Sequence, residues 1–170
     1  LVHSFYDARR ARLDELEPNA AHKALARLDA EWPGDLLIVT QNVDDLHERA
    51  GASRVLHMHG ELTGGLCTAC GSRFKWQGPM ASGPNNNQCP RCGLFGQVRP
   101  DIVWFGEMPY EMERIDEALM NCDLFVSIGT SGAVYPAAGF VQTARYRGAH
   151  CLEINLEPSQ GSIFFDERGH

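Results

Sequence analysis

Apolar residues along this chain occur in two patterns, short continuous runs and longer segments with the spacing of a helix. The runs are rich in β-branched residues, as in strands covered on both faces in a parallel sheet, and Leu36 to Thr40 is the clearest of them. The expected strands are residues 36–40, 55–59, 101–105, 124–128 and 151–155. The expected helical segments are residues 2–16, a helix capped by Asn19 that runs to about residue 32, and residues 42–50, 110–121 and 136–147. Strands separated by helices indicate βαβ units, and therefore an α/β fold with a doubly wound parallel sheet.

The composition changes abruptly between Gly60 and Pro100. This stretch holds four of the six cysteines and a Gly-Pro-Asn-Asn-Asn loop, and it has little helical or strand periodicity. We therefore expect two domains, a discontinuous one made of residues 1–60 and 101–170 and a small inserted module at residues 61–100.

The 170 residues are 44% hydrophobic and 22% charged, which excludes a disordered chain and fits a globular protein. The 22 acidic residues exceed the 15 Lys and Arg residues, giving a net charge of -7, so we expect no nucleic-acid partner. No apolar run approaches the ~20 residues of a membrane-spanning helix, and the first residues lack the pattern of a signal peptide. These features predict a cytoplasmic protein without a membrane partner. Residue 1 is Leu rather than Met, which indicates that an upstream segment is absent.

Two Cys-x-x-Cys pairs predict a structural zinc site. Cys67 and Cys70 form the first pair, Cys89 and Cys92 the second, and 18 residues lie between them, a spacing expected of a four-cysteine site. Four thiolates leave zinc no open position for water or substrate, so its role would be structural. Disulfides and a nucleic-acid-reading zinc ribbon are the alternatives; the acidic composition disfavours the second.

Polar residues follow several of the predicted strands, where ligands bind in open α/β sheets. These segments are Thr40-Gln41-Asn42-Val43-Asp44, His59-Gly60-Glu61, Gly129-Thr130-Ser131-Gly132 and Asn155-Leu156-Glu157. The glycine and hydroxyl residues at 129–132 could receive a phosphate, but in isolation this tetrapeptide favours a plain turn. His57 and His59 are two residues apart on one predicted strand. Position favours His59 as a general base, because it lies at the end of the strand, and His57 as a hydrogen-bonded core histidine.

Taken together with Val103-Trp104-Phe105-Gly106-Glu107 and the two cysteine pairs, these segments resemble a bacterial sirtuin over essentially the whole chain. Sirtuins are NAD-dependent protein lysine deacylases, with a Rossmann-type domain and an inserted zinc-ribbon module. The resemblance implies an enzyme that removes succinyl, malonyl or acetyl groups from protein lysines, giving nicotinamide and O-acyl-ADP-ribose. Its partners would be acylated-lysine proteins or peptides, and its cofactors NAD and a structural zinc ion.

The resemblance also assigns roles to individual residues. His59 would be the catalytic base. Residues expected to bind NAD are Gln41, Asn42, Val43, Asp44, Gly129, Thr130, Ser131, Asn155, Leu156 and Glu157. The backbone of the substrate peptide would pair with Val103, Trp104, Phe105 and Gly106.

The segment Phe5-Tyr6-Asp7-Ala8-Arg9 is similar to the Tyr-x-x-Arg element of the sirtuin subclass that removes acidic acyl groups. Tyr6 and Arg9 are three residues apart on a predicted helix, so a phenol and a guanidinium could bind one carboxylate. A solvated basic face is the alternative, because Arg10 and Arg12 lie beside them.

The sequence also departs from the sirtuin pattern. The N-terminal Gly-Ala-Gly phosphate loop, the first strand, and the last strand and helix of the family are absent, so we expect an incomplete Rossmann-type sheet and weak NAD binding by these 170 residues alone. The alternatives to a deacylase are a truncated, inactive fold that acts as a binding piece, and a mono-ADP-ribosyltransferase that uses the same cofactor.

Overall fold

The computed structural model describes residues 2–81 and 87–169, and it divides into two compact units, Leu1–Glu111 and Met112–His170. Each unit is considered by itself below. The predicted Gly83–Asn87 loop lies, except for Asn87, outside the described residues. No helix within the described ranges is long and apolar enough to cross a membrane.

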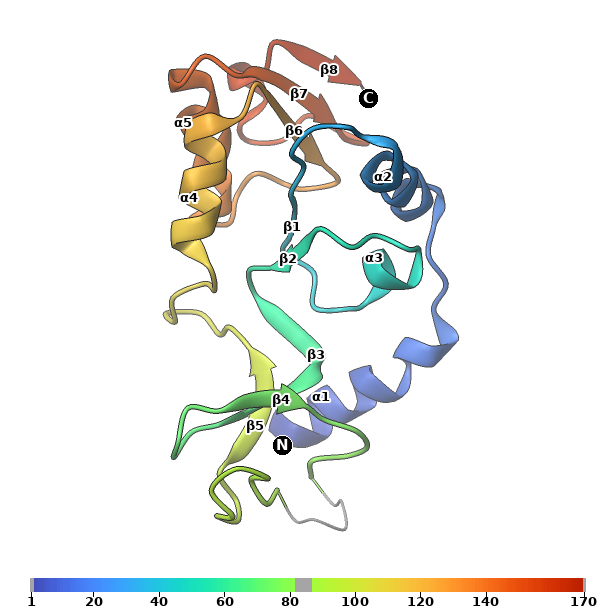
Figure 1. Cartoon of the computed structure of the whole chain (residues 1–170), viewed down its shortest axis with the longest axis vertical. Helices are drawn as coiled ribbons and strands as arrows, with labels where there is room; N and C mark the ends of the chain where they lie inside the picture. Colours follow the sequence, from blue (N-terminus) through green and yellow to red (C-terminus); the bar gives the residue numbers. More distant parts are fainter. Residues whose placement is uncertain (1, 82–86, 170) are drawn as a thin grey trace. The chain divides into compact units, whose positions relative to one another are not determined.

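The first unit contains helices on the N-terminal side and two small sheets (Figure 1). Its helical elements are α1 (Val2–Ala11), the 3-10 turn η1 (Leu13–Glu15), α2 (Ala20–Glu31) and α3 (Leu46–Arg49). Its strands are β1 (Ile38–Thr40), β2 (Val55–His57), β3 (Gly60–Cys67), β4 (Arg73–Lys75) and β5 (Val98–Ile102). β1 and β2 pair in parallel, as predicted, whereas β3 is the central strand of an antiparallel sheet with the order β4-β3-β5.

The predicted start of α2 is confirmed. The Asn19 side chain accepts a hydrogen bond from the His22 N–H, and His22 Nδ1 accepts one from the Asn19 N–H, which completes a capping box. The first predicted helix is shorter than expected, because α1 ends at Ala11 and a separate 3-10 turn follows.

Several predicted strands have different bounds. Leu36 and Leu37 precede β1, and the β1 residues Ile38 and Val39 are only half-buried rather than covered on both faces. The strand expected at 55–59 ends at His57, so His59 lies in the turn that leads into β3 rather than on the same strand. The strand expected at 101–105 runs instead from Val98 to Ile102, because its pairing with β3 already begins at Val98, which lies opposite Cys67.

The second unit is a three-stranded parallel sheet with two helices beside it (Figure 1). Its elements are α4 (Met112–Asn121), β6 (Leu124–Ile128), η2 (Ala137–Gly139), α5 (Phe140–Tyr146), β7 (His150–Ile154), η3 (Ser162–Phe164) and β8 (Glu167–Gly169). The strand order is β6-β7-β8, with Leu124 opposite His150. The parallel sheet and the β6–α5–β7 crossover are as predicted, with β8 an additional strand.

Separate clusters of buried side chains stabilise the parts of the first unit. Leu13, Leu62 and Ile102 pack with Tyr6 and Val43, and so join the N-terminal helical segment to the β3–β5 sheet. A second cluster contains Cys67, Met80, Cys89 and Val98, with Phe74 and Trp76 packed against it. This second cluster is the core of the cysteine-rich region, and it is small enough that a bound metal would add substantially to its stability.

Candidate functional site

The loop after β1, residues 41–44, is held by the segment that runs from the end of β2 into β3. Four consecutive peptide carbonyl groups, that of Thr40 at the end of β1 and those of the first three loop residues, accept hydrogen bonds from the second segment. The pairs are Thr40 with Met58 N–H (3.1 Å), Gln41 with His59 Nδ1 (3.2 Å), Asn42 with His57 Nδ1 (3.2 Å) and Val43 with Leu62 N–H (2.7 Å). The predicted cofactor residues of this unit and the predicted base therefore occupy one connected piece of structure.

The bond from His59 to Gln41 sets the tautomer of the imidazole. A carbonyl oxygen can only accept, so Nδ1 carries the proton, and in the neutral ring Nε2 is then the basic nitrogen. His59 lies at the turn between β2 and β3, directly before Gly60, which has a φ of 83°. A Cβ atom at Gly60 would lie 1.9 Å from the Asp101 carbonyl oxygen, so only glycine permits β3 to approach β5 this closely beside the base.

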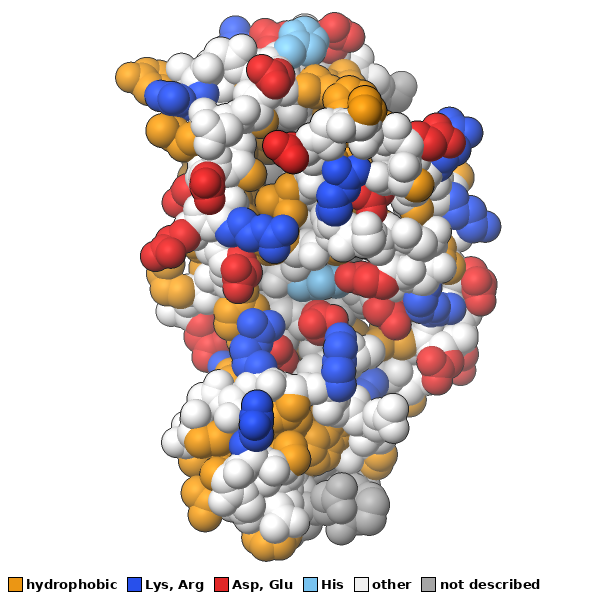
Figure 2. Space-filling view, in the orientation of Figure 1, with side chains coloured by type: hydrophobic (Ala, Val, Ile, Leu, Met, Phe, Trp, Pro, Cys, Tyr) orange, Lys and Arg blue, Asp and Glu red, His pale blue; other side chains and the backbone are white. Residues whose placement is uncertain are grey.

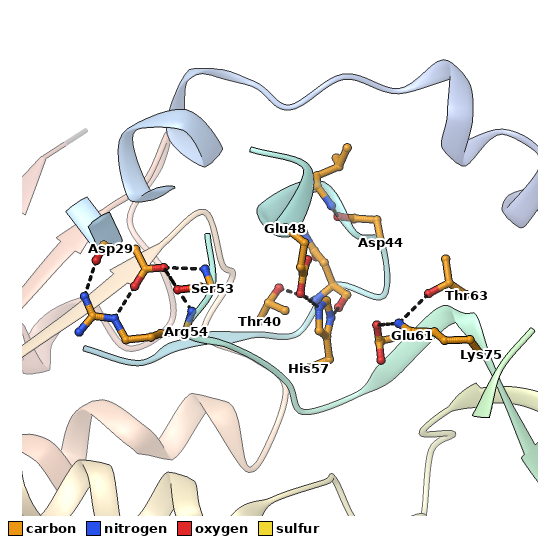
Figure 3. Close-up of polar contacts among 12 residues, drawn as sticks. Asp29, Thr40, Asp44, Glu48, Ser53, Arg54, His57, Glu61, Thr63 and Lys75 are labelled. Carbon is orange, nitrogen blue, oxygen red and sulfur yellow. Dashed lines mark hydrogen bonds and ion pairs between the residues drawn. The ribbon is translucent and has the colours of Figure 1, made fainter. Parts of the chain in front are cut away.

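His57 is hydrogen-bonded, as predicted, and its partners are now identified (Figure 3). Nε2 lies 2.8 Å from Glu48 Oε1 of α3, and Nδ1 lies 3.2 Å from the Asn42 carbonyl. Burial disfavours the charged imidazolium, but the hydrogen bond and the charge of Glu48 outweigh it and raise the pKa of His57 above its ordinary value of 6.5. Burial likewise opposes ionisation of Glu48, yet His57 lowers the pKa of that carboxyl.

The side chains of the loop itself have different surroundings. Asn42 is exposed, and its N–H donates to Thr40 Oγ1 at 3.1 Å. Asp44 accepts from the Leu46 N–H at 3.2 Å, which places it at the start of α3. The neighbouring His47 is buried with its ring 4.7 Å from that of His22, and burial lowers its pKa. His47 is thus a packed helix residue.

An open pocket of about 400 Å³ lies beside α1, lined by Val2, Phe5, Tyr6 and Trp104. It brings together two predicted substrate residues from distant parts of the chain, Tyr6 and Trp104. Arg9 is exposed, and its guanidinium lies over the Phe5 ring at 4.5 Å from the centroid. The residues that follow Tyr6 and Arg9 on α1 have other contacts. Asp7 and Arg10 contact the cysteine-rich region.

The segment predicted to pair with a peptide backbone is a loop rather than a strand. The Val103 N–H donates to the His59 carbonyl at 2.9 Å, and the Trp104 N–H donates to Glu107 at 2.9 Å. Arg99 bonds the same Glu107 at 2.7 Å and lies over the Trp104 ring at 4.1 Å. Phe105 is fully exposed, and Gly106 adopts a φ of 91°. Peptide pairing would therefore rely on carbonyl groups and on the outer part of this loop.

The four predicted metal ligands converge. The Sγ atoms of Cys67, Cys70, Cys89 and Cys92 all lie within 4.8 Å of one another, and two of the separations are 3.8 Å. A tetrahedron with metal–sulfur bonds of about 2.3 Å has sulfur–sulfur edges of about 3.8 Å, so the four thiols fit a zinc ion. None of the six cysteines forms a disulfide, which disfavours the alternative reading of the pairs.

The two cysteine pairs form matching turns. Gly71 N–H donates to the Cys67 carbonyl and Gly93 N–H to the Cys89 carbonyl, each at 2.9 Å, and both glycines have φ values above 70°. The Ser72 hydroxyl, with the Ser72 backbone, lowers the pKa of the Cys70 thiol to about 6. Because the thiolate is the form of cysteine that binds metal, Ser72 favours the form in which Cys70 can act as a metal ligand.

In the second unit, the loops after β6 and β7 are joined to each other. The Asn155 side chain donates to the Thr130 carbonyl at 2.7 Å, and the Gly129 N–H donates to the Ile154 carbonyl at 3.0 Å. The Ser131 hydroxyl accepts from the Ala133 N–H at 3.3 Å and retains its own hydrogen for a ligand oxygen. Leu156 and Glu157 are exposed beyond β7. Asn155 thus stabilises the Gly129–Ser131 loop. The two predicted NAD-binding segments of this unit therefore lie next to each other.

Comparison with known proteins shows which protein family has this combination of loops and cysteines. The sequence profile described as the Sir2 family matches residues 2–136. An NAD-dependent protein deacylase of Pasteurella multocida strain Pm70 is 54% identical over 169 residues, which are 98% of this chain and 71% of that protein. The chain belongs to the Sir2 family.

Solved sirtuin structures agree with the fold. A Sir2 homologue in complex with NAD superposes with a TM-score of 0.87 at 34% identity, covering 98% of this chain and 64% of the other. A Sir2 protein bound to a p53 peptide and NAD+ has a TM-score of 0.75 at 25% identity, covering 92% of this chain and 65% of the other. The chain thus spans about two thirds of these solved chains. Its class is that of the NAD-dependent protein deacylases, whose co-substrate is NAD.

Two features of this sirtuin were missed by sequence reasoning. The first is the Glu48–His57 pair, whose members lie nine residues apart on different elements; only the side-chain geometry joins them. The second is the Asp7–Arg10 pair on α1. Asp7 accepts from the Met80 and Ala81 N–H groups, and Arg10 donates to the Leu62 carbonyl. The adjacent Tyr6 and Arg9 carried a recognisable motif, whereas nothing in the sequence indicated that Asp7 and Arg10 bind the module.

Proposed function

We propose that the protein containing this chain removes acyl groups from protein lysines in a reaction that consumes NAD, with His59 as the general base. The observation that carries the proposal is the His59–Gln41 bond, which leaves Nε2 as the basic nitrogen beside the predicted cofactor loop. A neutral imidazole has a pKa suited to accepting a proton near pH 7.

Each group of residues has a proposed task. His59 Nε2 accepts a proton from a ribose hydroxyl. Asn42 and Asp44, with Gln41 and Val43, line the nicotinamide and ribose part of the site. The loops Gly129–Ser131 and Asn155–Glu157 hold the phosphate and adenosine parts. NAD supplies the electrophilic ribose carbon and the nicotinamide leaving group when it is bound.

The zinc ion has no proposed part in the chemistry. Cys67, Cys70, Cys89 and Cys92 would fill its coordination shell, so it stabilises the module that we propose as a separate domain at residues 61–100. Four reduced thiols and the fit to zinc also support the proposed cytoplasmic location. The net charge of -7 supports proteins rather than nucleic acids as partners. On the face shown in Figure 2, side chains of both signs are interspersed, which agrees with that choice.

We propose further that the acyl groups include acidic ones, succinyl and malonyl, in addition to acetyl. Tyr6 lines the pocket beside α1, and Arg9 is exposed one turn along the same helix next to Phe5, another pocket residue. A phenol and a guanidinium on one helix face offer a carboxylate two donors, one of them charged.

The substitutions Tyr6→Phe and Arg9→Met test this specificity. Only the succinyl group offers a carboxylate, and a lost charge-assisted hydrogen bond costs ~1.5–3 kcal/mol, so kcat/KM for a succinyl-lysine peptide should fall roughly 10- to 100-fold. The value for an acetyl-lysine peptide should change little. Arg12→Met is the matched control, because Arg12 lies on the same segment and is 76% exposed. Parallel loss of both activities would refute the acidic-acyl specificity and leave the deacylase proposal untouched.

A further inference from the structure

Of the four carbonyl hydrogen bonds described above for residues 40–43, two come from imidazole rings. Thr40 and Val43 are held by backbone N–H groups, which donate at any pH, whereas Gln41 and Asn42 are held by His59 and His57. A bond from an imidazole depends on which nitrogen carries a proton. The middle of the loop is therefore the part whose shape depends on the protonation of histidines.

The two hydrogen-bond acceptors beside His57 favour the charged form of its imidazole ring. Both of its partners, the Asn42 carbonyl and the Glu48 carboxylate, have only lone pairs to offer. A neutral imidazole carries one N–H and can satisfy one of them, while the imidazolium satisfies both. His59 differs, because only its Nδ1 faces an acceptor in the loop. The two neighbouring histidines thus differ in the number of hydrogen-bond acceptors that their rings face.

The charged groups around His57 favour the cation. Glu48 of α3 contacts it directly, and Glu61 of β3 acts on it from the other side while pairing with Lys75 of β4 at 2.7 Å. His47 of α3 is an imidazole whose charge would act against it, and burial lowers the pKa of His47. The carboxylates therefore outweigh it; Figure 3 shows the contact of Glu48 with His57 and the pairing of Glu61 with Lys75.

We propose that His57, kept as a cation by Glu48, is a positioning residue that holds residues 41–44 in the shape that binds NAD. This inference rests on the proposed function of that loop. When His57 loses its second proton, it keeps one partner and releases the other, and the carboxylate retains the remaining hydrogen because a charged acceptor binds it more strongly. Asn42 then loses its anchor, and the exposed Asn42 side chain moves with it.

The pH dependence follows from the direction of the shift. The pKa of His57 is raised above its ordinary value of 6.5, so the cation is lost as the pH rises past that raised value, at a higher pH than for an ordinary histidine. We expect the KM for NAD to rise on this alkaline side.

Three substitutions separate the two bonds of His57. Asn carries its amide nitrogen near the place of Nδ1, so His57→Asn retains a donor for the Asn42 carbonyl without a titrating group. Gln reaches toward the place of Nε2, so His57→Gln retains a partner for Glu48 and loses the loop bond. Leu removes both. A neutral hydrogen bond contributes about 0.5–1.5 kcal/mol, so His57→Gln and His57→Leu should raise the KM for NAD about 3- to 10-fold, while kcat changes less.

The conservative variant supplies the decisive comparison. His57→Asn should keep the KM for NAD within about twofold of the wild-type value, and that KM should no longer rise at alkaline pH. Glu48→Gln should move the alkaline rise to lower pH, because the cation loses its anionic partner. If the Gln and Asn variants, both folded by circular dichroism, have the same KM and pH profile as the wild type, the positioning role is wrong.

Nuclear magnetic resonance tests the same inference without catalysis. In the protein as its gene encodes it, labelled with ¹⁵N at histidine, both ring nitrogens of His57 should show the shifts of protonated nitrogen at pH 7. A singly protonated His57 at that pH would overturn the inference. Absence of NAD turnover in the wild type would instead refute the proposed function, and the ¹⁵N result would still decide the charge of His57.

Discussion

At the scale of single residues, two histidines two positions apart have different hydrogen-bond partners, and we propose different tasks for them. Sequence periodicity would place both on one strand face, but β2 ends at His57 and the turn carries His59 away from it. The single acceptor at His59 leaves a nitrogen for catalysis, whereas the two acceptors at His57 use both nitrogens. The choice of His59 as the base therefore has a geometric reason as well as the family resemblance.

We expect that Gly60, which directly follows the proposed base His59, cannot be replaced by a residue with a side chain. Gly60→Ala would force a Cβ atom against the Asp101 carbonyl at 1.9 Å, whereas Gly78→Ala, at a similar φ of 79°, has nothing within 4 Å. Both changes carry the strain of a positive φ, so their difference isolates the clash. We expect Gly60→Ala to lower the free energy of unfolding by at least about 2 kcal/mol more than Gly78→Ala, measured by denaturant titration. Equal losses would mean that β3 and β5 separate at little cost.

At the scale of elements, α1 connects the predicted acyl pocket to the cysteine-rich module. Tyr6 faces the pocket, and Asp7 binds the Met80 and Ala81 N–H groups of the module at 2.8 and 2.7 Å. Burial opposes ionisation of Asp7, but these two bonds and Arg10 outweigh it and lower its pKa. The module thus helps to fix α1, the helix that carries the proposed specificity residues Tyr6 and Arg9.

Metal removal should reveal this connection. A chelator that removes zinc should unfold the module around Cys67 first, because a structural zinc site contributes folding free energy directly. Hydrogen–deuterium exchange should then increase in residues 60–102 and in α1, and remain unchanged in β6–β8 of the second unit. The native protein should contain one zinc ion per chain by metal analysis. Well under one zinc per chain, or a Cys67–Cys70 disulfide, would contradict the account of this site.

The sequence predicted some elements well and missed others for identifiable reasons. β6 at Leu124–Ile128 and the capped start of α2 were predicted because a β-branched run and a local cap depend on neighbouring residues alone. β3 was missed because Gly60, Gly64 and Gly65 weaken its strand signal, and its stability comes from pairing with the distant β5. The four cysteines were predicted as a set because metal coordination constrains their spacing. The Glu48–His57 pair could not be predicted, because it depends on the orientation of α3 relative to β2.

At the scale of the whole molecule, acid should destabilise the protein through carboxylates whose folded-state pKa is low. Asp29 is the clearest example, because the Ser53 N–H and Arg54 lower its pKa from 3.8 (Figure 3). The unfolded state therefore binds more protons below about pH 5, and stability falls as the pH falls through that range. Asp29→Asn should flatten the pH dependence of the urea midpoint between pH 5 and 3. An unchanged slope would show that other carboxylates dominate.

The central claim, NAD-dependent deacylation with His59 as base, is tested most directly by identifying products. The protein as its gene encodes it is incubated with NAD and a succinyl-lysine peptide, and mass spectrometry quantifies every product. We predict free lysine peptide, nicotinamide and O-succinyl-ADP-ribose in equal amounts. His59→Ala should lower the rate ~10²–10⁴-fold, whereas His150→Ala, a histidine of the second unit that is half exposed, should not. ADP-ribose attached to protein with the peptide left acylated, or an undiminished rate in a folded His59→Ala variant, would contradict the claim.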